Sequence, residues 1–159
     1  MAVDMFLKLD GIKGESKDSK HKDEIHIESF SWGMSQTGTH GVGGGGGAGK
    51  VSVHDLSITK NVDKSSPPMM LACCNGKHIK DGLITVRKAG EKPLEYMKIK
   101  LTDILVSGVQ HAGHGSELLT ENVTLNFSKF ELEYQEQKPD GSGVTAGQIG
   151  WDIKKNEKV

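Results

Sequence analysis

Apolar and polar side chains alternate along much of this chain. Hydrophobic residues fall at every second position in five segments, which are residues 5–9, 25–27, 51–53, 97–101 and 123–127. Successive side chains of a β-strand point to opposite faces of a sheet, so a period of two predicts half-buried strands. The chain is therefore expected to fold mainly as β-sheet, with long antiparallel strands.

The alternation changes phase inside three segments, which are residues 25–32, 51–58 and 123–134. A one-residue shift sends every later side chain to the other face of the sheet unless a bulge absorbs the extra residue. The expected bulges lie near residues 28–29, 54–55 and 128–129. Two explanations stay open, separately or together. Bulges bend the strands around a closed barrel, or the strands expose apolar faces that another subunit covers.

One segment has a different pattern. Ser66 is a suitable helix N-cap, two prolines follow it in the first turn, and Gly76 suits a left-handed C-cap. These signals predict one short α-helix over residues 67–75. Its methionine, leucine and cysteine side chains leave little polar surface, so we expect the helix to be largely buried, against the barrel or against a partner.

The segment from Gly38 to Gly49 contains eight glycines in twelve residues and predicts an extended loop. Residues Gly44–Lys50, which overlap the end of this segment, match the phosphate-binding pattern G-x-x-x-x-G-K. However, Val51 stands where that motif has Ser or Thr, and the alternating residues that follow indicate a strand instead of the required helix. A hydrolase that uses Gly44–Lys50 is kept only as an alternative.

Composition excludes several classes of function. The net charge is −1, which does not suit a nucleic-acid partner. The longest apolar run, Met69–Cys74, is too short for membrane insertion, and the N-terminus has no signal-peptide pattern. The two adjacent cysteines and seven scattered histidines have neither disulfide nor metal-site spacing, and no motif of nucleophilic catalysis is complete. We therefore predict no enzyme, catalytic residue, metal or cofactor.

Several longer strings resemble a known family in their sequence and order. They are MAVDMFLKLDGIKGES, SWGMSQ, GAGKVSVHDLSITK, LITVRKAG, LTENVTLNF and GWDIKKN. The family is the haemolysin-coregulated proteins (Hcp), the tube subunits of bacterial type VI secretion systems. The resemblance covers nearly the whole chain.

The resemblance implies a two-sheet antiparallel β-barrel with one short α-helix and an extended glycine-rich loop, formed by residues 1–159 as a single domain. It implies that six copies close into a ring around a channel. Rings stack into a tube inside a sheath, behind a spike, and small effectors bind in the lumen. The subunit would assemble in the cytoplasm and then be secreted through the type VI machine. A monomeric β-barrel that binds a ligand is the alternative.

The resemblance also implies site residues. Ser31, in the string Ser-Trp-Gly, matches a lumen-facing position and is the candidate contact for effectors. Such a lumen is expected to be polar and rich in small residues, because apolar patches would trap cargo. The extended loop is expected to contact the neighbouring ring. The candidate ring-stacking residues are Gly38, Thr39, His40, Gly41, Val42, Gly43, Gly44, Gly45, Gly46, Gly47, Ala48 and Gly49.

Overall fold

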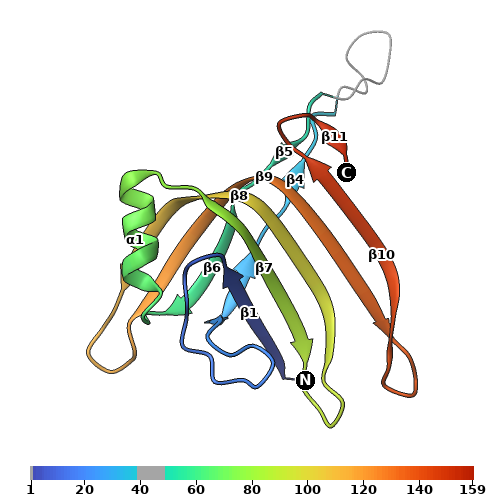
Figure 1. Ribbon diagram of the computed structural model, residues 1–159, viewed down its shortest axis with the longest axis horizontal. Helices are drawn as coiled ribbons and strands as arrows, with labels where there is room; N and C mark the ends of the chain where they lie inside the picture. Colours follow the sequence, from blue (N-terminus) through green and yellow to red (C-terminus); the bar gives the residue numbers. More distant parts are fainter. Residues whose placement is uncertain (1, 39–48) are drawn as a thin grey trace.

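The computed structural model of the protein describes residues 2–38 and 49–159. These residues form eleven strands and one helix (Figure 1). The elements are β1 (Val3–Leu9), β2 (Ile25–Ile27), β3 (Ser29–Ser31), β4 (Met34–Ser35), β5 (Ser52–Val53), β6 (Leu56–Asn61), α1 (Ser66–Asn75), β7 (Ile79–Lys88), β8 (Leu94–Ala112), β9 (Thr120–Gln137), β10 (Gly143–Asp152) and β11 (Glu157–Lys158). The prediction of a mainly β fold with one short helix is confirmed.

All strand pairs are antiparallel, in the order β2–β1–β7–β8–β9–β10–β11. β9 also pairs with β6, and β6 pairs with β3. Since β3 follows β2 after only Glu28, and β2 pairs with β1, the path of strand pairs leads around the core and back to β1. Figure 1 shows the long strands β7 to β10 curving side by side, with α1 beside one end of the molecule.

The long β8–β9 hairpin connects two parts of this sheet. β8 pairs with β7 only as far as Ile104, and beyond that residue it pairs with β9 alone. The first half of β9, up to Leu125, pairs with β6, whereas its second half, from Lys129 onward, pairs with β10. The parts of β8 and β9 that lie beside β6 and β3 therefore form a separate four-stranded region.

The phase changes of the sequence have two structural causes, and neither is a bulge at the predicted place. At Glu28 and at residues 54–55 the chain leaves one strand and starts another. β9 instead continues through Ser128, and the strand pairing skips Ser128 on β9 and Asp103 on β8 together. Asp103 has a left-handed backbone, with φ of 56°. In both strands the alternation of inward and outward side chains therefore shifts by one residue at the same place. This shift lets Phe127 and Phe130 face the same core.

The start of α1 differs from the prediction by one residue, whereas its end at Asn75 and the C-cap Gly76 are as predicted. The helix begins at Ser66, Ser65 holds the N-cap position without a capping side-chain bond, and Gly76 ends the helix with φ of 68°. The Ser66 hydroxyl cannot cap the helix because it is used elsewhere. It donates to the Glu121 carboxylate and accepts the backbone N–H of Asp63 at 3.1 Å.

Only one side of α1 is buried. Met69 and Ala72 belong to the core, whereas Met70 and Leu71 are 42% and 62% exposed. Within one copy the prediction of a largely buried helix is therefore wrong, because the sheet covers a single helix face. The other possibility, burial against a partner, stays a prediction.

Both tryptophans pack against the core. The Trp32 ring contacts Phe127 and Phe130 edge to face, with centroid distances of 6.1 Å and 4.8 Å. The indole N–H groups of Trp32 and Trp151 are buried and have no hydrogen-bond partner in the described part of the chain.

Candidate functional site

The outward side of the four-stranded region β3–β6–β9–β8 is polar, and we call it the polar face. Inward residues of these strands, such as Ile58 and Leu125, are fully buried. The residues between them point the other way because side chains alternate along a strand. Two rows of residues that are paired across all four strands are Ser31–Ser57–Thr124–Gly108 and Ser29–Thr59–Asn122–Gln110. Every residue in these rows is uncharged, and most are small.

Side-chain hydrogen bonds connect the strands across the polar face. Thr59 Oγ1 donates to Asn122 Oδ1 at 2.7 Å. Ser107 Oγ lies 2.7 Å from Asp55 Oδ2 and 2.9 Å from Thr124 Oγ1. A serine hydroxyl has one proton, so Ser107 donates to the carboxylate and accepts from Thr124. The face is therefore an ordered polar surface rather than a set of independent side chains.

Ser31 lies on the polar face. It is an exposed residue of β3 and pairs with Ser57 of β6. Its neighbours on the face are hydroxyl, amide and glycine residues, as a lumen that does not trap cargo requires. The role of Ser31 as an effector contact stays a prediction.

Two of the candidate ring-stacking residues are described, Gly38 and Gly49, and both are exposed. They lie on the loop side of the β4–β5 pair, beyond the pairing of Ser35 with Ser52. The other candidates lie outside the described residues: Thr39, His40, Gly41, Val42, Gly43, Gly44, Gly45, Gly46, Gly47 and Ala48.

Of the phosphate-binding pattern Gly44–Lys50, only Gly49 and Lys50 are described, and the element that follows them does not suit the motif. Strand β5 follows Lys50, whereas a phosphate loop leads into a helix whose N-terminal N–H groups bind the anion. Within residues 2–38 and 49–159, no group of three or more histidine, cysteine, aspartate or glutamate side chains is placed to hold a metal ion. No helix in the same ranges is long and apolar enough to cross a membrane.

Two hollows lie on the surface of the described part of the protein. One, of about 570 Å³, lies over β8, β9 and β10 and is lined by both lysines and glutamates, among them Lys98 and Glu131. The other, of about 260 Å³, lies at the base of the β4–β5 hairpin and is lined mainly by apolar residues such as Val53 and Trp151. Neither lining contains a histidine, cysteine or serine that could act as a nucleophile or base.

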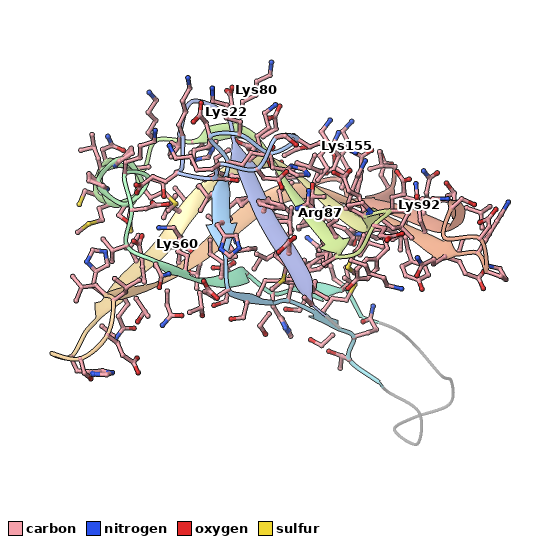
Figure 2. The ribbon with its side chains drawn as sticks, turned by 90° about the horizontal axis from the view of Figure 1, so that it is seen from below. Lys22, Lys60, Lys80, Arg87, Lys92 and Lys155 are labelled. Carbon is pink, nitrogen blue, oxygen red and sulfur yellow. The ribbon has the colours of Figure 1, made fainter. Side chains whose placement is uncertain are left out.

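A buried ion cluster lies between α1 and the sheet. Lys60 and Glu121 are both fully buried, and Lys60 Nζ lies 3.4 Å from Glu121 Oε2, 3.1 Å from Asp63 Oδ1 and 3.2 Å from Ser66 Oγ. Figure 2 shows Lys60 inside the molecule, whereas Lys22 and Lys80 reach its outside. The cluster joins β6, β9 and the first turn of α1. Our sequence reasoning missed it, although the alternation that directs Leu56 and Ile58 inward also directs Lys60 inward.

A second ionic network holds the segment after β1 against the sheet. Arg87 is 8% exposed, and its guanidinium donates to both carboxylate oxygens of Asp18, at 3.0 Å and 2.8 Å, and to Asp4 at 3.0 Å. It also lies 5.1 Å from the centre of the Phe6 ring, on which His21 stacks. The bidentate bond from Arg87 holds the pKa of the Asp18 carboxyl well below its usual range. No residue of either ionic network lines one of the two hollows described above.

Comparisons with known proteins agree with the resemblance noted in the sequence. Residues 6–134 match the model of a family described as "Type VI secretion system effector, Hcp". Protein hcp1 of Pseudomonas aeruginosa is 53% identical over 160 residues, and the match covers 98% of each chain.

Solved structures give the same result. The crystal structure of Hcp1 from Salmonella typhimurium is 37% identical, with a TM-score of 0.79 and full coverage of both chains. A structure titled as a type six secretion system protein is 28% identical, with a TM-score of 0.93, and the match covers 99% of this chain and 100% of that one. Hcp proteins are secreted structural proteins of the type VI tube and are not enzymes. This chain belongs to the Hcp family of type VI secretion proteins.

Proposed function

We propose that six copies of this chain close into a ring with the polar face turned toward a central channel. The rings stack into the tube of a type VI secretion system, and small effectors bind within the channel. Assembly takes place in the cytoplasm, beside the sheath and spike proteins, before the tube is secreted. The observation that carries this proposal is the polar face itself, in which two rows of uncharged residues run across four strands.

Unpaired strand edges on both sides of the polar face support ring closure. In the described part of the chain, β3 pairs only with β6, and β8 beyond Ile104 pairs only with β9. Free edges of a sheet present unpaired N–H and C=O groups that another chain can satisfy. The two edges belong to different strands, so contact between one copy and the next is heterologous, which closes into a ring when the rotation permits.

The composition of the polar face suits transient cargo. Small hydroxyl and amide side chains form hydrogen bonds with a guest but bury little apolar area, which is the main source of binding free energy. The channel is therefore expected to bind an effector weakly, so that the effector is released after delivery. Ser31 is close to the β3 edge of this face and is the contact we propose for effectors.

Ser31→Gln tests the channel function directly. The larger side chain would reduce the space available to a guest and change the hydrogen bonds offered at that point. We expect the abundance of a small co-expressed effector to fall, measured by quantitative immunoblot, while the ring persists in native mass spectrometry. Ser19→Gln, an exposed residue outside the polar face, is the matched control. Unchanged effector abundance in the Ser31 variant would contradict the proposal.

We also propose that residues 38–49 contact the neighbouring ring in a stack. Glycine lets two backbones approach closely, and ordering a glycine-rich segment costs about 1–2 kcal/mol per residue, which keeps such a contact weak. Replacing the glycines at 43–47 by alanine is expected to shorten the stacks in electron micrographs while single rings keep their mass. Stacks of unchanged length would rule out this role for the glycines.

A further inference from the structure

One carboxylate is hydrogen-bonded into the polar face. Asp55 lies directly before β6 and is exposed. Its Oδ2 accepts from Ser107 Oγ at 2.7 Å, and its Oδ1 accepts from Asn126 Nδ2 at 2.8 Å. The preceding residue, His54, is turned toward Ser35, with Nε2 3.3 Å from its hydroxyl. Asp55 therefore places a negative charge beside two rows of neutral residues.

A bulge in β8 holds this carboxylate in place. The pairing of β8 with β9 shifts between Val106 and Gly108, so Ser107 is the extra residue. Bulges redirect side chains, and this one directs the Ser107 hydroxyl to Asp55. A Cβ atom on Gly108 would lie 2.7 Å from Thr124 Oγ1, so a side chain here would displace the hydroxyl that Ser107 contacts. The carboxylate is thus preorganised by hydrogen bonds from two strands, β8 and β9.

We propose that Asp55 recognises cationic side chains, lysine or arginine, of polypeptides that pass along the polar face. This inference rests on the proposed channel function. Each carboxylate oxygen accepts one bond from the protein and has further acceptor capacity toward solvent. Charge-assisted hydrogen bonds from guanidinium or ammonium groups to such an oxygen are about twice as strong as neutral ones.

The symmetry of the ring would multiply the attraction between Asp55 and a cationic guest. Six copies place six Asp55 carboxylates at one level of the channel, where a guest meets several of them in succession. Each Asp55 carboxylate adds little binding free energy by itself, because a single exposed ion pair in water is weak. Together they would favour guests with basic segments over acidic guests of the same size.

The test uses assembled rings and two labelled peptides of equal length, one carrying arginines and the other glutamates at the same positions among glycine and serine. We expect the wild-type ring to bind the basic peptide more tightly at low salt, measured by fluorescence anisotropy. Asp55→Asn keeps the shape of the residue and one acceptor oxygen but removes the charge, and should weaken binding of the basic peptide about tenfold. Asp10→Asn, an exposed acid outside the polar face, should change nothing.

Equal affinity of the wild-type and Asp55→Asn rings for the basic peptide would overturn the role of Asp55. The proposed function is tested apart from it, by the native mass of the wild-type ring and by effector abundance in the Ser31→Gln variant. If the rings form and Ser31→Gln lowers effector abundance while Asp55→Asn has no effect on the peptides, only the charge recognition fails. Native masses that show only monomers would mean that the channel itself is absent.

Discussion

At the scale of the residue, Lys60 has the most demanding environment, since its ammonium group is fully buried beside Glu121. A buried ion pair contributes little net stability compared with an apolar pair, but removing one partner leaves an uncompensated charge. We predict that Lys60→Met destabilises the protein by about 3–5 kcal/mol, measured by urea unfolding at one fixed protomer concentration.

The double variant Lys60→Met/Glu121→Leu should be measured beside the single variant. It removes both charges, so no carboxylate is left buried without a counter-ion, and it should lose less stability than Lys60→Met alone. If the double variant were the less stable of the two, the cluster would stabilise α1 by packing and hydrogen bonds more than by charge compensation.

The Asp18–Arg87 contact predicts a pH dependence of stability. Arg87 lowers the pKa of Asp18 in the folded protein relative to the ordinary value of 3.8. A depressed carboxyl pKa stabilises the fold above that ordinary value, and the stabilisation is lost as the pH falls toward the folded-state pKa. Asp18→Asn should therefore lower the melting temperature at neutral pH, and its difference from wild type should shrink as the pH falls below about 3.8.

The control for this titration is Asp10→Asn, which removes an exposed carboxyl outside the Arg87 network. Its melting temperature should follow that of the wild type at every pH. A difference between Asp18→Asn and wild type that stays constant down to the lowest pH would mean that the carboxylate charge of Asp18 is not what stabilises the segment.

At the scale of the element, α1 has an apolar stripe that faces away from the barrel. Pro67, Met70, Leu71 and Cys74 are all exposed and are spaced three, four and seven residues from the first. This spacing places them on one helix face. α1 packs beside β8, the strand that carries one free edge of the polar face. In the proposed ring, the stripe lies where a neighbouring copy would cover it.

We predict that Leu71→Glu weakens ring assembly without destabilising the single subunit. Leu71 is 62% exposed, so the subunit loses little buried area, whereas an interface would have to bury the new charge unpaired. Native mass spectrometry at decreasing concentration should show the variant dissociating at a higher concentration than wild type. Ser19→Glu adds the same charge at an exposed residue between β1 and β2 and should assemble normally. Identical dissociation of the Leu71 variant and wild type would place α1 outside the interface.

The elements show how far the sequence could predict the fold. Alternation predicted the strands because it follows directly from the geometry of the β-backbone. It could not predict how β9 changes phase, since Ser128 is accommodated by the left-handed Asp103 of a different strand. The exposed side of α1 was not predictable either, because its burial depends on whether another copy is present.

The candidate site could also be predicted only in part from the sequence. The outward direction of the polar residues on β6 and β9 follows from alternation, and the position of Ser31 came from the family resemblance. The Asp55 contacts could not be predicted, because Ser107 reaches Asp55 only through a bulge that the pattern of residues 94–112 does not reveal.

At the scale of the whole molecule, the proposed ring makes a prediction about mass and salt. Six protomers of 17.2 kDa give a particle of about 103 kDa, whereas a monomeric ligand-binding module stays at 17.2 kDa. Pairing of strand edges and burial of apolar side chains depend little on ionic strength, and a net charge of −1 adds little repulsion between copies. We therefore expect the ring to keep its mass in sedimentation velocity from about 0.05 M to about 1 M NaCl. Dissociation at the high-salt end would show that ion pairs across the interface, rather than the free edges of β3 and β8, hold the copies together.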